Sequence, residues 1–313
     1  MIIYIETPFN IDQRNTLKTA LTGDTAIFKA DLTGEAAELD AISNADIIFG
    51  NPRPVEWLQQ ATSLKWLQLY STGFEYYRKL QLPALVTNMQ DYYSEPCAET
   101  AIAGIMALYR GMDKFPVLKS EKKWVGYTMR AELHLLANKK VLILGAGNIA
   151  KRTARILGGF DCQVTSFART KEKGVVNTVA EVEALIPAVD IIISCLPGTE
   201  ETKGFLTPVM IQHMKSTAIF CNVGRGNLVA DENVLVQALM DNKIGGAVLD
   251  VTDKEPLPED HPFWNCPNTI LSQHSGGGDA SEYDGILNFF LQNLDRYKSG
   301  QKLQNLVELG RGY

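Results

Sequence analysis

Three side chains that could hold an anion or transfer a proton follow three predicted strands in the second half of the chain. They are Arg225, Glu255 and His274. Carboxyl ends of parallel strands meet at one edge of a sheet, so we expect these side chains to lie together there. Reduction of a carbonyl by hydride transfer leaves negative charge on its oxygen, and a histidine can donate a proton to that oxygen near neutral pH. Glu255 would favour the charged imidazolium, and Arg225 could hold a carboxylate and polarise the neighbouring carbonyl. The spacing therefore predicts carbonyl reduction.

A glycine-rich turn precedes these residues and predicts a dinucleotide site. The apolar run 141–144 is typical of a buried parallel strand, the turn follows at once, and apolar residues then recur at helical spacing through 151–160. Such a strand, turn and helix bring backbone N–H groups and the positive end of a helix toward a pyrophosphate. Ala150 stands where a third glycine is usual, and an ordinary tight turn is the alternative interpretation. The residues expected to touch the cofactor here are Gly145, Ala146, Gly147, Asn148 and Ile149.

The residue after the second strand of this half bears on which dinucleotide binds. An acidic side chain there would hold the ribose 2′-hydroxyl of NAD, but this position is Arg169, with Lys171 and Lys173 close by. A cation suits the 2′-phosphate of NADP. We therefore predict NADP(H) as the preferred cofactor, contacted by Arg169, Thr170 and Lys171, with NAD(H) as the alternative. A solvated basic loop would be the structural explanation of the same residues.

Strand and helix patterns alternate along the chain and predict an α/β protein with two doubly wound parallel-sheet domains. A flavodoxin-like substrate domain is expected to take residues 1–93 and 282–313, and a Rossmann cofactor domain residues 94–281. Long helices at 94–113, capped by Ser94, and at 280–298 would cross between them. The strands are expected at 2–5, 25–29, 46–50, 66–70 and 84–88, and then at 141–144, 163–167, 190–196, 217–223, 244–251 and 269–272.

Composition excludes several classes of function. The chain has 313 residues, a net charge of −6 and five scattered cysteines. The charge disfavours nucleic acid and anionic membranes as partners, and the cysteine spacing supports neither a disulfide framework nor a metal site. There is no signal-peptide pattern and no apolar run of about 18 residues, so a reducing, cytoplasmic location is expected. The other histidines, to which no role is assigned, are His134, His213 and His261.

Several short motifs occur in an order and spacing that is highly specific. They are Ser71-Thr-Gly-Phe-Glu75, Ala98-Glu99-Thr100, Gly145-Ala-Gly147, Cys195-Leu-Pro197, Asn222-Val-Gly-Arg225-Gly226, Leu249-Asp250-Val251, Glu255-Pro256 and His274. With them the chain resembles the D-isomer-specific 2-hydroxyacid dehydrogenases over essentially its full length. Arg169, the glycine turn and a segment around Trp124 make it most similar to the NADPH-dependent glyoxylate/hydroxypyruvate reductases of that family.

The resemblance implies the catalytic set already named and adds further site residues. The main-chain N–H groups of Thr72 and Gly73 would hold the substrate carboxylate. Asp250 and the backbone of Val223 would orient the nicotinamide carboxamide. The remaining expected cofactor contacts are Leu196, Pro197, Gly224, His274 and Gly276. Members are commonly homodimers joined through the cofactor domain, so the same is expected here.

The identity of the 2-keto acid stays open between glyoxylate, hydroxypyruvate and bulkier acids. Asn51 follows a strand of the first domain and is expected to contact substrate, together with Thr72, Gly73, Arg225 and His274. Arg53 could meet a second anionic group or lie on the surface. Two alternatives are an NAD(H)-dependent D-lactate-type dehydrogenase and a non-catalytic dinucleotide sensor similar to C-terminal-binding corepressors. The first of these would have an acidic residue at position 169.

The chain departs from the family pattern at two positions beside the predicted catalytic residues. Gln273 stands where a proline usually precedes the histidine, and Gly224 stands where alanine or serine is more usual. Residues 276–278, which follow His274 and Ser275, are also all glycine. These differences concern the substrate and the rigidity of the loops more than the reaction.

Overall fold

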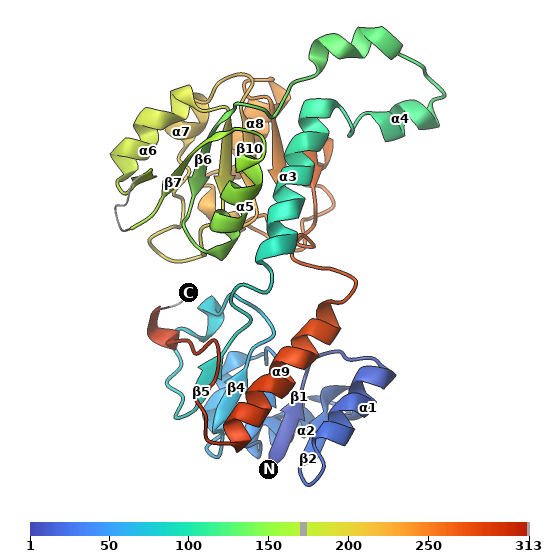
Figure 1. Ribbon diagram of the computed structural model, residues 1–313, viewed down its shortest axis with the longest axis vertical. Coiled ribbons are helices and arrows are strands. Elements are labelled where there is room, and N and C mark those ends of the chain that lie inside the picture. The colour runs from blue at the N-terminus through green and yellow to red at the C-terminus, as the bar shows by residue number, and fades with distance from the viewer. Residues whose placement is uncertain (170–173, 312–313) are drawn as a thin grey trace. The chain divides into compact units, whose positions relative to one another are not determined.

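The chain forms two compact units in the computed structural model, which describes residues 1–169 and 174–311 (Figure 1). The terminal unit comprises Met1–Tyr92 and Asp279–Tyr313, and the central unit comprises Tyr93–Gly278. The central unit is therefore inserted into the sequence of the terminal unit. Within the described residues, no helix is long and apolar enough to cross a membrane.

Five parallel strands form the sheet of the terminal unit, in the order β2-β1-β3-β4-β5. This order puts the change of winding direction between β1 and β3, as in flavodoxin-like sheets. The strands are β1 (Ile2–Ile5), β2 (Thr25–Phe28), β3 (Ile47–Phe49), β4 (Trp66–Gln68) and β5 (Leu85–Thr87). The helices are α1 (Ile11–Ala20), α2 (Glu35–Ser43) and α9 (Glu282–Lys298), with 3-10 turns η1 (Lys29–Asp31), η2 (Val55–Gln60), η3 (Glu75–Tyr77) and η8 (Leu309–Arg311).

Helix α9 returns the chain to the terminal unit and packs on its sheet. The ring of Phe290 stacks on that of Phe49, with centroids 4.1 Å apart, and on that of Trp66 at 5.3 Å. Asn293, on the same helix, is fully buried and donates a hydrogen bond to Oε1 of Gln68 at 3.3 Å. Residues from the two ends of the sequence therefore share one hydrophobic core.

An ion pair also joins α9 to the connection between α1 and β2. Asp24 accepts hydrogen bonds from Lys298 Nζ at 2.6 Å and from the Met1 amino group at 3.0 Å. Burial by itself would raise the pKa of the Asp24 carboxyl, but the two cationic donors outweigh it and hold that pKa below its usual value. We expect Asp24→Asn to lower the free energy of unfolding at pH 7 by about 1 kcal/mol, since solvent screens the partly exposed lysine.

This loss should depend on pH. A carboxylate with a depressed folded-state pKa stabilises the fold above its unfolded pKa of about 3.9, and the stabilisation disappears as the pH falls through the folded value. Urea unfolding of the wild type and Asp24→Asn should thus differ at pH 7 and converge as the pH falls through the lowered folded-state pKa of Asp24. The exposed Asp91 gives a control, Asp91→Asn, in the same unit. A difference between Asp24→Asn and wild type that persists at low pH would contradict the assignment.

Among its described residues, the central unit has a sheet of seven parallel strands in the order β12-β11-β10-β9-β6-β7-β8. The order reverses between β6 and β9, so the ligand position expected for a doubly wound sheet is at the carboxyl ends of these two strands. The strands are β6 (Lys140–Leu144), β7 (Gln163–Phe167), β8 (Val175–Val176), β9 (Ile191–Ser194), β10 (Ile219–Asn222), β11 (Gly246–Leu249) and β12 (Thr269–Leu271).

Helices cover both faces of this sheet and bury a separate apolar cluster on each (Figure 1). Helices α3 and α5 pack on one face, and α6, α7 and α8 pack on the other. Their bounds are α3 (Ser94–Arg110), α5 (Asn148–Gly158), α6 (Val179–Leu185), α7 (Pro208–Gln212) and α8 (Glu232–Met240). The 3-10 turns of this part are η5 (Ile186–Ala188), η6 (Gly226–Leu228) and η7 (Pro262–Asn265).

The helix predicted at 94–113 begins at the same residue as the observed α3, but it differs in its C-terminal end and in its N-terminal cap. It ends at Arg110 because Gly111 takes a left-handed conformation, with φ of 65°, at the C-terminal cap. Ser94 is its first helical residue, and Tyr93 occupies the N-terminal cap position. The Ser94 hydroxyl is buried without a hydrogen-bond partner within the described chain, so the predicted capping role of this serine is wrong.

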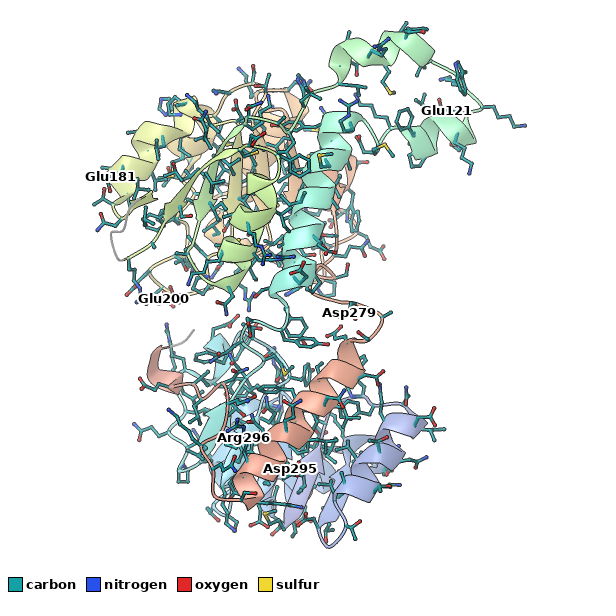
Figure 2. All side chains as sticks on the ribbon, in the orientation of Figure 1. Glu121, Glu181, Glu200, Asp279, Asp295 and Arg296 are labelled. Atoms are coloured by element: carbon teal, nitrogen blue, oxygen red, sulfur yellow. The ribbon has the colours of Figure 1, made fainter. Side chains whose placement is uncertain are left out.

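After α3 the chain projects from the central unit as an arm, residues 112–135 (Figure 1). The arm contains α4 (Phe115–Ser120) and η4 (Gly126–Glu132). Glu121, labelled in Figure 2, directly follows α4 on this arm. Trp124 and Tyr127 are 96% and 82% exposed, so the arm presents aromatic side chains to its surroundings.

Candidate active site

The turn between β6 and α5 has the geometry of an anion cradle. Gly145 has φ of +125°, which disfavours any side chain, and a Cβ there would lie 3.3 Å from the carbonyl oxygen of Cys195. Gly147 caps α5 without any side-chain hydrogen bond, and within the described residues no atom beyond its chain neighbours lies within 4 Å of where its Cβ would be. Among the described residues, the first N–H groups of this helix therefore have no side-chain cap. These residues fit a dinucleotide pyrophosphate, and Asn148 and Ile149 begin the helix that would hold it.

Ala150 explains how the turn functions without a third glycine. This residue is 2% exposed and belongs to the apolar cluster between α5 and the sheet. A methyl group is small enough for this close approach of helix and strand. Alanine at position 150, where a third glycine is usual, is therefore compatible with the packing of α5 on the sheet.

Four further predicted cofactor positions lie just past the ends of β9 and β10. Leu196 and Val223 are 8% and 4% exposed and continue the apolar surface past the strand ends, while Pro197 follows Leu196 directly. A Cβ on Gly224 would lie 2.5 Å from the carbonyl oxygen of Leu196. Alanine or serine, which are more usual at this position, would therefore clash with the backbone. The departure from the family pattern at this glycine reflects a close approach of two neighbouring loops.

The predicted 2′-phosphate contacts lie beyond β7, and the structure describes only one of them. Arg169 is the second residue after the end of β7, at the carboxyl edge of the sheet, and it is exposed. Thr170 and Lys171 lie outside the described residues. The position of Arg169 at this edge is the one at which a ribose contact is expected in a Rossmann sheet.

The structure brings two of the three predicted catalytic side chains into contact. His274 Nδ1 lies 2.6 Å from Oε2 of Glu255. The other carboxylate oxygen, Oε1, accepts a hydrogen bond from the backbone N–H of Thr252 at 3.1 Å, which fixes the orientation of the carboxylate. With Nδ1 donating to the carboxylate, Nε2 is the ring nitrogen that can exchange a proton with a substrate. The imidazole is about half exposed, at 53%, so this nitrogen can be reached.

The backbone around His274 explains the missing proline. Gln273 and His274 both have left-handed backbone conformations, with φ of 56° and 55°. Proline is restricted to φ near −65°, so it cannot occupy position 273 in this loop. The N–H of His274 donates to the carbonyl oxygen of Asp250 at 2.6 Å, which holds the turn against the end of β11.

Arg225 lies at the end of β10, the strand beside β11. The three predicted catalytic residues thus follow three consecutive strands in the sheet order β12-β11-β10. Nη1 of Arg225 donates a hydrogen bond to the carbonyl oxygen of Gly224 at 2.8 Å. Nδ2 of Asn222 donates one to the carbonyl oxygen of Arg225 at 2.9 Å. Asn222 also accepts from the N–H of Gly224 at 3.1 Å, so one amide side chain supports both residues.

Two polar residues of this site were missed from the sequence. Asn222 is 1% exposed at the end of β10, and Ser272 follows β12 with its hydroxyl on the Asp250 carboxylate at 2.7 Å. Asp250 itself is 5% exposed and also accepts from the N–H of Gly276 at 2.9 Å. The available signal was a polar residue directly at the end of an otherwise apolar strand, where a buried polar group needs a partner.

The cysteines beneath this edge have no catalytic character. Burial, with a smaller contribution from the Asp250 charge, raises the pKa of the Cys97 thiol to about 12, although Arg225 opposes the rise. Burial likewise raises the pKa of the Cys195 thiol to about 12. Neither supplies a thiolate near neutral pH. Among the described residues, no group of three or more His, Cys, Asp or Glu side chains could hold a metal ion.

The residues predicted to bind substrate in the terminal unit lie in neighbouring loops after β3 and β4. Asn51 Oδ1 accepts a hydrogen bond from the backbone N–H of Tyr70 at 3.2 Å, which joins the two loops. Thr72 is held through its carbonyl oxygen by Asn88 Nδ2 at 2.6 Å. Within the described chain, the N–H groups of Thr72 and Gly73 donate no hydrogen bond, so both are available to an anion.

Arg53 lies in the same loop as Asn51. Its guanidinium carbon is 3.7 Å from the centroid of the Tyr76 ring, a cation–π contact. This contact accounts for the orientation of Arg53 without a ligand, and the second anionic group considered from the sequence is not needed to explain it.

The doubly wound sheet of the central unit and its glycine turn are typical of a dinucleotide-binding protein. The model of the D-isomer specific 2-hydroxyacid dehydrogenase NAD-binding domain matches residues 102–276, more than half of the chain. The chain belongs to the D-isomer-specific 2-hydroxyacid dehydrogenase family.

Relatives with assigned names share the same family but differ in substrate. Glyoxylate/hydroxypyruvate reductase A of Arabidopsis thaliana is 30% identical over 223 residues, which cover 70% of this chain and 69% of that protein. Hydroxyphenylpyruvate reductase of Plectranthus scutellarioides is also 30% identical over 223 residues, with the same coverage of 70% and 69%. A family member from Aeromonas salmonicida subsp. salmonicida has a solved structure with a TM-score of 0.83 and 26% identity, covering 98% of each chain. The predicted fold class and family are thereby confirmed.

Proposed function

We propose that this protein reduces a small 2-keto acid of the glyoxylate or hydroxypyruvate type to the D-2-hydroxy acid, using NADPH. The central unit would bind the dinucleotide, and the terminal unit would contribute contacts to the keto acid. The observation that carries the proposal is the contact of 2.6 Å between His274 and Glu255 at the carboxyl edge of a Rossmann sheet. An acid–base pair in this position is what reduction of a carbonyl requires.

The side chains of the chain have distinct roles in this proposal. The reduced nicotinamide, when bound, supplies the hydride. Arg225 holds the substrate carboxylate and favours negative charge on the adjacent carbonyl oxygen. His274 donates the proton from Nε2 to that oxygen, and Glu255 stabilises the imidazolium and fixes the ring. The N–H groups of Thr72 and Gly73 would add hydrogen bonds to the same carboxylate.

A panel of 2-keto acids tests the function directly. Purified protein would be assayed with glyoxylate, hydroxypyruvate, pyruvate and hydroxyphenylpyruvate, each with NADPH and with NADH, by the loss of absorbance of the reduced cofactor. The proposal expects the highest kcat/KM for a small acid with NADPH. Activity confined to the aromatic acid would change the substrate class, and failure to oxidise either cofactor with any acid would contradict the proposal.

Arg169 should determine the choice between the two dinucleotides. A guanidinium attracts the 2′-phosphate of NADPH, whereas a carboxylate at the same place repels it and can accept from the 2′-hydroxyl of NADH. We expect Arg169→Asp to lower kcat/KM for NADPH by about 100-fold and to leave that for NADH within about threefold, since a charge reversal costs a few kcal/mol at such a contact. Arg155→Asp is the control, because it makes the same charge reversal in the last turn of α5, at the end of that helix opposite the glycine turn. An unchanged cofactor ratio in Arg169→Asp would refute the assignment.

We further propose a homodimer formed by the central units through the arm. The 96% exposure of Trp124 and 82% exposure of Tyr127 support it, because large exposed aromatic side chains are enriched where proteins associate. Light scattering of the purified protein in solution measures its mass.

The five cysteines are all free, which suits the reducing cytoplasm as the location of the protein.

A further inference from the structure

Only one oxygen of the Asp250 carboxylate accepts hydrogen bonds from the described residues. Its Oδ1 accepts a hydrogen bond from the Ser272 hydroxyl at 2.7 Å and another from the N–H of Gly276 at 2.9 Å. A Cβ on Gly276 would lie 3.0 Å from both carboxylate oxygens, so the loop backbone packs directly against the carboxylate plane. The residue is 5% exposed, and two donors on one oxygen fix the rotation of its side chain.

The second oxygen, Oδ2, is left for another donor. Within residues 1–169 and 174–311 no donor to Oδ2 is present, and this oxygen is not among the fully buried side-chain atoms that lack a partner. A carboxylate oxygen in this state can accept a hydrogen bond from an amide NH₂ group. Asp250 directly follows β11, and the family resemblance implies that it orients the nicotinamide carboxamide. The inference below rests on that expectation and on the proposed function.

The loop that carries His274 does not depend on the Ser272 hydroxyl. The N–H of His274 donates to the carbonyl oxygen of Asp250 at 2.6 Å. Ser275 donates to the carbonyl oxygen of Ser272 twice, from its N–H at 3.0 Å and from its hydroxyl at 2.6 Å. None of these contacts uses the Ser272 hydroxyl, whose hydrogen bond goes to the Asp250 carboxylate.

We propose that Ser272 is a positioning residue for the cofactor: with the Gly276 N–H it locks one oxygen of Asp250, so that the other oxygen is presented to the nicotinamide carboxamide. Ser272 touches neither the substrate nor the imidazole in this arrangement. Removal of its hydroxyl allows the carboxylate to rotate and weakens cofactor binding, while the contact between His274 and Glu255 is retained.

The test compares three variants, Ser272→Ala, Ser272→Thr and Ser275→Ala. Affinity for NADPH is measured without any keto acid, by fluorescence titration, and steady-state kinetics are measured at saturating NADPH over a range of pH. We expect Ser272→Ala to raise the Kd of NADPH by about 10-fold, the effect of losing one hydrogen bond to a charged group. The keto acid KM and the midpoint of the pH profile should stay within about twofold of wild type. Ser272→Thr retains the hydroxyl and should restore the Kd.

Ser275→Ala distinguishes positioning from general loosening of the loop. It removes a hydrogen bond that holds the His274 turn, so it should change the pH profile and the keto acid KM more than the Kd of NADPH. A Ser272→Ala variant that behaves like Ser275→Ala, or one that binds NADPH as tightly as wild type, would overturn the proposal. So would failure of Ser272→Thr to restore binding.

The binding titration separates this inference from the proposed reaction. Wild-type protein that binds NADPH but reduces no acid of the panel would contradict the proposed function and still give a Kd for each variant. Wild-type protein that binds neither dinucleotide would overturn both.

Discussion

Replacing His274 with glutamine is expected to lower kcat for the reduced 2-keto acid by about 10³-fold, within the range measured for loss of a general acid. Glutamine has a similar volume but cannot donate a proton to the substrate oxygen as it becomes an alkoxide, so the proton must come from water. The Kd of NADPH should change much less than kcat, because the Asp250 carboxylate and its donors are untouched. Rapid-mixing measurement of cofactor oxidation at saturating substrate gives the chemical step directly.

Two comparisons make this result specific. Glu255→Gln removes the charge that stabilises the imidazolium and leaves the ring in place, so a smaller loss of about 10-fold is expected. His213→Gln makes the same change at an exposed histidine after α7 and should leave kcat unaltered. If His274→Gln kept more than about a tenth of the wild-type kcat, the assignment of the general acid would be wrong.

The second large effect is expected at Gly226, beside the predicted catalytic arginine. A Cβ built there would lie 1.9 Å from the carbonyl carbon of Thr252, 2.0 Å from its oxygen and 2.4 Å from the N–H nitrogen of Asp253. All three atoms belong to backbone, which cannot rotate away as a side chain can. Gly226→Ala must therefore separate the loop after β10 from the loop after β11, and we expect a loss of about 3 kcal/mol or more in stability.

The same separation should remove activity even in protein that remains folded. Thr252 holds the Glu255 carboxylate through its N–H, and Arg225 precedes the glycine, so the clash displaces both sides of the site. Thermal unfolding and kcat/KM are the measurements. Gly158→Ala is the control, because in the part of the chain that the structure describes no atom outside the neighbouring backbone of α5 lies within 4 Å of its Cβ position, so alanine there should be neutral or slightly stabilising. Equal melting temperatures for the two alanine variants would contradict the packing argument.

Much of the fold followed from local pattern. The apolar runs indicated the two parallel sheets, and Thr207 and Asp231 cap α7 and α8 with their side chains, as is typical of these residue types. The two-residue strand β8 was missed because two residues carry no periodicity. Ser94 was assigned a cap from its residue type alone, whereas the backbone of Tyr93 decides where α3 begins.

The candidate site was accessible from sequence only in part. That Arg225, Glu255 and His274 follow neighbouring strands could be predicted, because strand ends share an edge regardless of the detailed packing. Contacts that depend on how two loops approach each other could not. The steric requirement for Gly224 and the positive φ of Gln273 are both properties of the tertiary structure, and in the sequence they are only departures from a pattern.

The left-handed pair at 273 and 274 has a practical meaning for anyone who redesigns this enzyme. A relative with proline before its histidine must have a different backbone conformation at that position. Exchanging single residues between the two proteins would therefore place a side chain on a backbone that does not support it. A transplant would have to carry the whole turn from Ser272 to Gly276, along with the aspartate on which it is anchored. The interchangeable module is thus a loop with its anchor.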